Sequence, residues 1–289
     1  MENQDIAIRP PSEAFSILLQ VTRGCSHNAC AFCGAYRGTP FQPVPWSRIE
    51  EVLAFAARWC RRQNTLFLAD GDALSLSHDT MLTLLERIRR DLPWVRRVSS
   101  YASCHNILAR TDAQLAQYRS LGLKRLYMGL ESGHDPVLVA MAKGVNSAAM
   151  VEAGLRARQA GMFVSVSCVL GLGGVTQWRE HALATARALE RMQPHQIALL
   201  SLMLLPNTPL YRRTREGRFV PQDTMGLLRE LRELLGALGP IRTQLHANHP
   251  SNHLPLVGRW PRDRDALLAT IDSALNGALP LQPESCRAL

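Results

Sequence analysis

The sequence predicts an α/β fold built around parallel strands. Short β-rich runs alternate with longer segments of helical period along most of the 289 residues. Such alternation requires crossover connections, which make the strands parallel and leave the helices packed outside them. With 33 Lys and Arg, 24 Asp and Glu and 46% hydrophobic residues, the chain can bury a large core, so disordered, collagenous and coiled-coil classes are excluded.

Six strands are expected, with helical segments between them. The predicted strands are residues 16–22, 65–69, 96–101, 124–129, 162–170 and 196–204. The apolar helical faces are Ile49, Val52, Leu53 and Ala56, then Met81, Leu84, Leu85 and Ile88, and finally Leu227, Leu231, Leu234, Leu235 and Leu238. Six units are too few for a closed eight-stranded barrel, and a doubly wound sheet is the competing arrangement.

The pattern changes beyond Gly239. Residues 240–261 are rich in Pro, His and Asn and are expected to be irregular, and a helix with Leu267, Leu268, Ile271 and Leu275 on one side follows. No linker long enough to separate a second domain is visible. We therefore expect a main domain of residues 1–239 and a C-terminal extension, 240–289, that packs on it.

Charge and composition indicate a chain of the cytoplasm. The net charge of +9 raises the question of nucleic acid, but the basic residues are dispersed, so nucleic-acid binding is not favoured, although an RNA substrate stays open. The longest apolar stretches are too short to span a membrane. Residues Met1–Asp5 lack the features of a signal peptide. The seven cysteines, an odd number, then point away from disulfides.

The informative motif follows the first predicted strand. Cys25, Cys30 and Cys33 stand at the spacing CxxxxCxxC on one loop. Three thiolates can hold three corners of a cubane iron-sulfur cluster and leave the fourth iron open. The alternatives are a tetrahedral Cys3His zinc site that includes His27, and three buried cysteines without a ligand.

This loop resembles that of the radical S-adenosylmethionine (SAM) superfamily. The signature of that superfamily is CxxxCxxC after the first strand of a partial six-stranded barrel, with an aromatic residue before the last cysteine, which Phe32 matches. The first gap here is one residue longer than in the family pattern. The resemblance implies a partial (β/α)6 barrel of parallel strands with a short C-terminal extension, whose cofactors are a [4Fe-4S] cluster on Cys25, Cys30 and Cys33 and SAM.

Further resemblances lie at the ends of later strands. Asp70-Gly71-Asp72 stands where the family has Gly-Gly-Glu, which meets the amino group of SAM, and Asp72 takes the acidic place, with an ordinary acidic turn as the alternative. Gly-Leu-Glu-Ser-Gly, residues 129–133, matches a family segment in which the glutamate, here Glu131, binds the ribose or amino group of SAM. The other residues expected to contact SAM are Ser103, Gly171 and Leu205.

The remaining cysteines and histidines receive weaker roles. Cys60 and Cys168 are expected in the core, and Cys286 has no partner at metal-ligand spacing. Cys104 is a candidate hydrogen-atom donor to a substrate radical, although a small loop residue is the simpler interpretation. The tail histidines, His246, His249 and His253, have no familiar zinc spacing. We expect their loop, with Asn248 and Asn252, to cap the barrel opening and shape the substrate pocket.

The resemblance implies a radical enzyme that acts as an oxidoreductase. Reductive cleavage of SAM would yield methionine and a 5′-deoxyadenosyl radical, which abstracts hydrogen from a small-molecule or peptide substrate. An external one-electron reductant of the flavodoxin or ferredoxin type is the implied protein partner. The alternatives are an RNA-modifying radical SAM enzyme and a non-catalytic zinc or iron-sulfur protein that senses redox state. Neither fold nor cofactor specifies the substrate.

Overall fold

A computed structural model describes residues 8–288 of the chain. The chain divides into two compact units. The first contains Met1–Asn28, Gly38–Met128 and Arg156–Val164, and the second contains Ala29–Arg37, Gly129–Leu155 and Ser165–Leu289. Residues Met1–Asp5, used above to judge the signal peptide, lie outside the described part. No helix within residues 8–288 has the length and apolar character that a membrane span needs.

The six predicted strands are all present. They are β1 (Ile17–Gln20), β4 (Thr65–Ala69), β5 (Arg97–Tyr101), β6 (Leu123–Glu131), β7 (Phe163–Leu170) and β8 (Gln196–Ser201). The strand order of the described sheet is β1-β4-β5-β6-β7-β8-β9-β10. Parallel pairing, as predicted, joins β1 to β4, β4 to β5, β5 to β6 and β7 to β8. The α/β fold with parallel strands is therefore confirmed.

Two strands of the eight-stranded sheet were not predicted. The second unit contains β9 (Thr243–Ala247), parallel to β8, and β10 (Leu256–Trp260), antiparallel to β9. The expectation of an irregular stretch from 240 to 261 is wrong over these residues. Thr243, Leu245 and Ala247 are buried while Gln244 is exposed, which is the alternation of a half-buried strand. The domain boundary at residue 239 stays a prediction.

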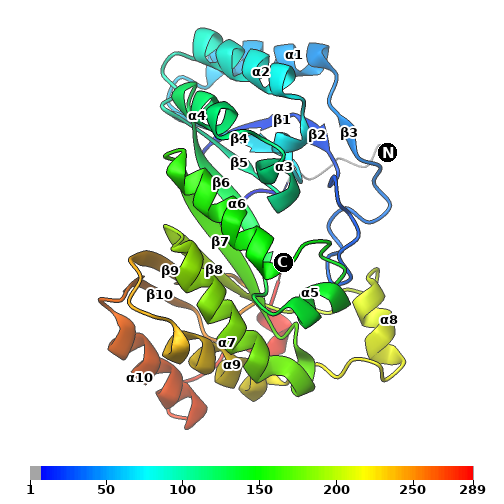
Figure 1. Ribbon diagram of the computed structural model, residues 1–289, viewed down its shortest axis with the longest axis vertical. Helices are drawn as coiled ribbons and strands as arrows, with labels where there is room; N and C mark the ends of the chain where they lie inside the picture. Colours follow the sequence, from blue (N-terminus) through cyan, green and yellow to red (C-terminus); the bar gives the residue numbers. More distant parts are fainter. Residues whose placement is uncertain (1–7, 289) are drawn as a thin grey trace. The chain divides into compact units, whose positions relative to one another are not determined.

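The first unit packs amphipathic helices against its strands. These helices are α1 (Trp46–Trp59), α2 (His78–Asp91), α3 (Cys104–Leu108) and α4 (Asp112–Ser120), and a short antiparallel pair is formed by β2 (Thr22–Arg23) and β3 (Gln42–Pro43). Figure 1 shows α1 and α2 side by side. Ser77 caps α2 by accepting from the amide of Thr80, and Thr111 with Gln114 forms a capping box on α4, so local sequence sets where these helices begin.

The second unit carries the helices that follow β6. They are α5 (Asp135–Ala140), α6 (Ser147–Gln159, which ends in the first unit), α7 (Gly174–Met192), α8 (Pro209–Arg215), α9 (Thr224–Ala237) and α10 (Arg264–Leu275). The leucines predicted to share one face of the α9 segment, Leu227, Leu231, Leu234, Leu235 and Leu238, are all buried. Helix α9 lies between α7 and α10 (Figure 1).

The remaining cysteines and the surface charge follow most of the predictions. None of the seven cysteines forms a disulfide. Cys168 is buried, as expected, whereas Cys60 is only half-buried at the C-cap of α1, which corrects its assignment to the core. Burial, and secondarily the negative charge of Glu131, raises the pKa of the Cys168 thiol well above its usual range, so this thiol is unreactive.

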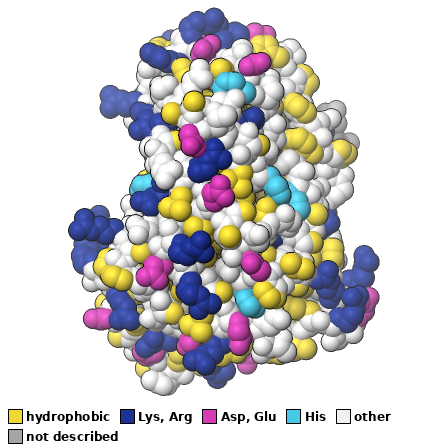
Figure 2. Space-filling model, in the orientation of Figure 1, with side chains coloured by type: hydrophobic (Ala, Val, Ile, Leu, Met, Phe, Trp, Pro, Cys, Tyr) yellow, Lys and Arg dark blue, Asp and Glu magenta, His cyan; other side chains and the backbone are white. Residues whose placement is uncertain are grey.

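On the face in Figure 2, basic side chains lie in separate groups, with acidic ones among them.

Candidate cofactor site

The end of β4 holds the beginning of the cysteine loop in the first unit. Asp70 accepts a hydrogen bond from the Gly24 amide at 3.0 Å and another from the Gln20 side chain at 3.4 Å. A Cβ on Gly71 would lie 2.7 Å from the Gly24 carbonyl oxygen and 3.0 Å from the Cys25 Cα, so only glycine fits there. Asp70 and Gly71 therefore fix the position of the backbone at Gly24 and Cys25.

Asp72 is a buried carboxylate with one oxygen free. Its Oδ2 accepts hydrogen bonds from Ser26 Oγ at 3.1 Å and Asn106 Nδ2 at 2.6 Å. Its Oδ1 is buried and has no hydrogen-bond partner among residues 8–288. Burial raises the pKa of Asp72, and the nearby polar groups of Ser103, Asn106 and Ser26 partly reverse that shift. A buried acceptor without a donor is costly, so this oxygen is suited to a cationic ligand group.

Ser103 and Cys104 lie at the start of α3, next to Asn106. The Ser103 hydroxyl accepts from the Asn106 amide at 3.2 Å and so caps the helix. Cys104 is the first helical residue and is buried. The ring of His27, the fourth ligand of the alternative zinc site, stacks on His105 with centroids 6.2 Å apart. Contact of Ser103 with SAM and hydrogen donation by Cys104 stay predictions.

The cysteine loop passes from the first unit, with Cys25, into the second, with Cys30 and Cys33. None of the three thiols is in a disulfide, and all three residues are half-buried. Arg37 donates to the carbonyl oxygens of Cys33 at 3.2 Å, Ala29 at 3.3 Å and Cys30 at 2.5 Å, so its guanidinium holds the loop from within the same unit. Three thiols on one short loop are a donor set for iron or zinc. Within residues 8–288, however, no three His, Cys, Asp or Glu side chains are grouped as metal ligands.

Two helices of the second unit fix the loop between its last two cysteines. The amide of Ala31 donates to the carbonyl of Met141, directly after α5, at 2.8 Å, and the amide of Leu210 in α8 donates to the Ala31 carbonyl at 2.9 Å. A buried apolar cluster accompanies these bonds, and Phe32 packs against it; its members are Ala31, Val137, Met141, Leu172, Leu202 and Leu210. Leu205 contacts the same loop, because a Cβ on Gly34 would lie 2.8 Å from its Cδ1.

Glu131 ends β6 with a left-handed backbone, φ +62°. Its Oε1 is 3.0 Å from Lys143 Nζ, a partner that the sequence alone did not suggest. The carboxylate folds back over Gly129, where a Cβ would collide with it, and a Cβ on Gly133 would collide with the Ala184 carbonyl. Gly133 is thus required by its close approach to backbone, whereas a side chain at Gly129 would displace the Glu131 carboxylate from its present position.

Gly171, at the end of β7, is held by a buried polar network. Its φ of +90° requires glycine, and its amide donates to Glu230 Oε1 at 3.0 Å. Glu230 on α9 also accepts from His181 Nδ1 of α7 at 2.7 Å and from Gln222. Sequence reasoning missed Glu230 and His181. The available signal was a charged residue inside the apolar face of α9, since Leu227, Leu231 and Leu234 flank Glu230.

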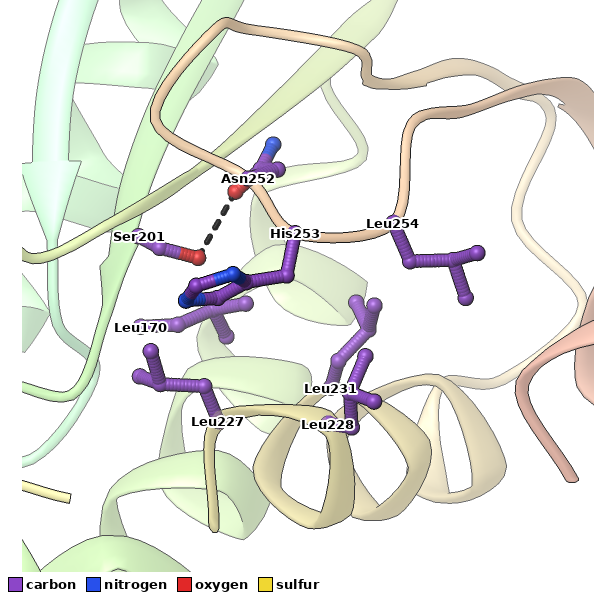
Figure 3. A pocket seen from close by; sticks show the side chains of 8 residues that line it. All are labelled: Leu170, Ser201, Leu227, Leu228, Leu231, Asn252, His253 and Leu254. Carbon is purple, nitrogen blue, oxygen red and sulfur yellow. Dashed lines mark hydrogen bonds between the residues drawn. The ribbon is translucent and has the colours of Figure 1, made fainter. Parts of the chain in front are cut away.

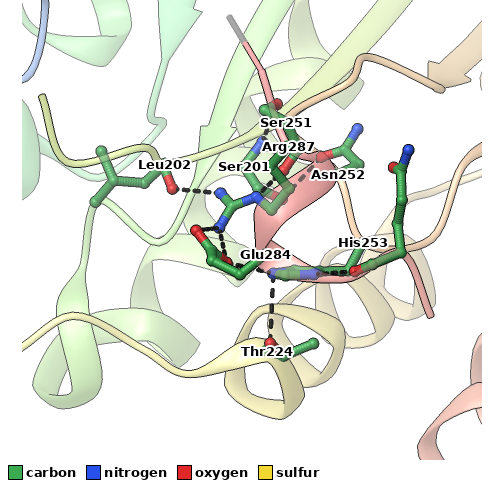
Figure 4. Close-up of polar contacts among 9 residues, drawn as sticks. Ser201, Leu202, Thr224, Ser251, Asn252, His253, Glu284 and Arg287 are labelled. Atoms are coloured by element: carbon green, nitrogen blue, oxygen red, sulfur yellow. Dashed lines mark hydrogen bonds and ion pairs between the residues drawn. The ribbon is translucent and has the colours of Figure 1, made fainter.

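The polar residues of the extension are used inside the second unit. Both amide hydrogens of Asn252 are donated to strand carbonyls, of Leu199 at 2.7 Å and Ala247 at 2.8 Å, and its Oδ1 accepts from Ser201 (Figure 4). Asn252 lies beside β8 and β9, where strand carbonyls need donors, so its amide supports the fold of this unit. The expectation that it also shapes a substrate pocket stays a prediction.

His253 and the C-terminal segment form a second set of contacts there. His253 Nδ1 bonds the Gln282 carbonyl at 2.8 Å, its Nε2 lies 3.4 Å from Glu284, and Arg287 donates to the Leu202 carbonyl at 2.7 Å (Figure 4). Figure 3 shows the His253 ring above leucine side chains of β7 and α9, beside a cavity of about 10 Å3. That volume holds about one water molecule, not a substrate. His246 and His249 join no group of metal ligands among the described residues.

Comparisons with known proteins identify the family of this chain. Residues 19–186, more than half of the chain, match the family described as the radical SAM superfamily. Among curated protein sequences none matches this chain.

Solved structures are similar in fold. Coproporphyrinogen III oxidase (HemN) from Escherichia coli, described as a radical SAM enzyme, has a TM-score of 0.58 and 15% identity over 76% of this chain and 51% of its own. Methylornithine synthase (PylB) has a TM-score of 0.55 and 17% identity over 76% of this chain and 62% of its own. The methyltransferase TsrM from Kitasatospora setae, solved with cobalamin and a [4Fe-4S] cluster, has a TM-score of 0.54 and 17% identity over 67% of this chain and 38% of its own.

The match covers less than two thirds of each of these solved chains, and identities this low show the fold alone. That fold is the partial barrel of parallel strands expected above. The family match adds the cofactors, because radical SAM enzymes bind a [4Fe-4S] cluster and SAM. The chain is an enzyme of the radical SAM superfamily.

Proposed function

We propose that this enzyme cleaves SAM reductively at a [4Fe-4S] cluster on Cys25, Cys30 and Cys33 and then abstracts hydrogen from a small-molecule or peptide substrate. When bound, the reduced cluster supplies the electron that splits SAM into methionine and a 5′-deoxyadenosyl radical. The chain's own residues bind and orient SAM and exclude water from the reacting atoms.

The observation that carries this proposal is the free oxygen of Asp72. The SAM amino group is a cationic donor, and Asp72 Oδ1 is a buried acceptor without a donor. The same carboxylate is bonded to Ser26, the residue after Cys25. A charge-assisted bond from the ammonium would satisfy the orphan oxygen and offset the cost of burying the charge.

Other residues have separate proposed roles. Glu131, already paired with Lys143, accepts from the ribose or amino group of SAM. Gly171 and Leu205 lie along the adenine, Ser103 contacts SAM, and Phe32 packs the cysteine loop. Asp70 and Gly71 act on the cofactor site indirectly, because they hold Gly24 and Cys25 at the start of the cysteine loop.

The class of reaction and the cellular setting are also proposals. Hydrogen abstraction makes the enzyme an oxidoreductase, with a flavodoxin or ferredoxin as its electron source. Seven cysteines without a disulfide suit a reducing compartment, so we propose the cytoplasm.

Anaerobic reconstitution tests the proposal. The reconstituted enzyme, given SAM and dithionite, should bind one four-iron cluster and form 5′-deoxyadenosine, and host metabolites with shifted mass would identify the substrate. Near-stoichiometric zinc with negligible iron would overturn it. A salt-dependent shift of tRNA, together with modified nucleosides, would instead assign the enzyme to RNA.

A further inference from the structure

Helix α8 and the turn after it carry an arginine patch. We define this patch as Arg212, Arg213, Arg215 and Arg218; residues 209–218 contain one acidic residue, Glu216, which pairs with Arg218. Arg212 and Arg215 are exposed, and no ion pair joins either to another described residue. Figure 2 shows basic side chains gathered where Figure 1 draws α8.

Arg212 and Arg215 are thus two exposed arginines three positions apart with no ion pair to a described residue. In two basic pairs of the first unit, by contrast, one arginine of the pair is compensated, because Arg90 pairs with Asp91 and Arg97 pairs with Glu13. Such partners reduce the field that a charge presents to solvent. The α8 arginines therefore form a local positive surface. Basic residues spread evenly over the protein would not form one.

The patch is rigidly attached to the cysteine loop within the second unit. The first turn of α8 is bonded to Ala31 through Leu210, and Asn207 Nδ2 donates to the Gly34 carbonyl at 3.0 Å. Ala31 and Gly34 are the residues directly after Cys30 and Cys33. At 1.5 Å of rise per residue, Arg212 and Arg215 lie only about 5 and 9 Å along the axis from the first residue of α8. A partner seated on the patch would thus be close to the thiols of this unit.

We infer that the α8 arginine patch docks an acidic one-electron carrier protein of the flavodoxin class. The inference rests on the proposed function, which requires an electron from outside. One electron passes from the anionic flavin hydroquinone, which becomes the neutral semiquinone, to the oxidised cluster, whose charge falls by one; no bond is made or broken and no proton moves. Opposite charges steer such short-lived encounters and raise their association rate.

The protein partner fits the patch better than RNA does. Single-stranded nucleic acid is usually held by a basic groove lined with exposed aromatic side chains on which bases stack. Tyr211 and Phe219, the aromatic residues near the patch, are half-buried instead. A small charged surface on a short helix is typical of transient electron-transfer contacts.

The test compares two double charge reversals in the reconstituted enzyme. Arg212→Glu with Arg215→Glu removes the patch. Arg62→Glu with Arg89→Glu is the control, because it changes the net charge equally at two exposed positions of the first unit. A bacterial flavodoxin and tRNA are the probes. Three quantities are measured at low and high salt: the Kd for oxidised flavodoxin, the Kd for tRNA, and the ratio of 5′-deoxyadenosine formed with flavodoxin hydroquinone to that formed with dithionite.

In the patch variant we expect the low-salt Kd to rise and the ratio to fall, each about tenfold, while the control changes both less than twofold. High salt should remove most of the difference. Unchanged flavodoxin binding in the patch variant, equal effects in the control, or loss of tRNA binding instead would overturn the inference. Failure of the proposed function is recognised separately, since the wild-type enzyme would then form no 5′-deoxyadenosine even with dithionite.

Discussion

Two buried carboxylates at opposite ends of the strands of the first unit have very different surroundings. Glu13, at the amino ends, is fully buried and accepts from Tyr127 at 2.6 Å and Ser16 at 2.5 Å, with Arg97 and Arg125 at 3.2 and 3.7 Å. Asp72, at the carboxyl ends, is 1% exposed, bonds only neutral donors and keeps one oxygen free.

The different surroundings of Glu13 and Asp72 indicate that one carboxylate serves stability and the other serves function, although both lie at the ends of the same strands. Glu13 is satisfied by hydroxyl donors and two cations, so its charge joins the short helix Pro11–Glu13 to β5 and β6. Asp72 is incompletely satisfied, so its charge is a cost in the absence of a ligand. In parallel β/α folds the carboxyl ends of strands carry ligands and the amino ends carry stability, and these two residues follow that rule.

The largest expected effect concerns the carboxyl-end loop. Replacing Cys25, Cys30 or Cys33 by Ser should each abolish the four-iron cluster, because every thiolate supplies one of three protein bonds to it. Iron and sulfide per chain measure the loss, and the thermal unfolding of the metal-free protein should hardly change. Cys60→Ser is the matched control and should keep its cluster. A full cluster in any of the three variants would exclude that cysteine as a ligand.

Glu13→Gln should mainly lower stability. Removing the charge leaves Arg97 and Arg125 without their partner, which should reduce the free energy of unfolding by about 2 to 3 kcal/mol. Urea unfolding of the metal-free protein measures this, with Glu86→Gln on the exposed side of α2 as control. Weakened SAM binding with unchanged stability would contradict the comparison.

Glu131→Gln extends the comparison to the second unit. The amide keeps the size of Glu131 but weakens charge-assisted hydrogen bonds, so SAM should bind about ten- to hundredfold less tightly with the cluster intact. Isothermal titration of the reconstituted enzyme with SAM measures the change. Lys143→Gln separates the two roles of the carboxylate, because it removes the ion pair and leaves Glu131 charged. Unchanged SAM affinity in Glu131→Gln would remove this residue from the site.

Asp72→Asn should weaken SAM binding about tenfold and yet leave the fold as stable or more so. The folded-state pKa of Asp72 is raised above 3.8, so the stability that its protonated form contributes is lost as pH rises through that folded pKa. The variant should therefore match the wild type near pH 4, about the unfolded value, and become relatively more stable at higher pH. Urea unfolding of the metal-free proteins across this range measures the difference in free energy of unfolding. A variant that becomes less stable than the wild type as pH rises would show that the charged Asp72 stabilises the fold, as Glu13 does.

Local patterns in the sequence were sufficient for most of the fold. The six barrel strands are short apolar runs and the helices between them have continuous apolar faces, so both are visible in a window of a few residues. Strands β9 and β10 escaped because Pro, His and Asn around them resemble a loop. The alternation of buried and exposed side chains in β9 depends on its pairing with the edge of β8, which only the structure shows.

The sequence by itself determined the cysteine spacing, the order of the strand-end motifs and hence the cofactor class, because these depend on residues that are neighbours in the chain. Only the tertiary structure decided which polar groups are buried and what they meet. Asp72 accepts from Asn106, which follows another strand, and keeps its second oxygen without a partner; Glu131 pairs with Lys143, and Glu230 reaches Gly171 across 59 positions. Burial and partner choice arise from contacts between distant segments, and a pattern read along the chain contains neither.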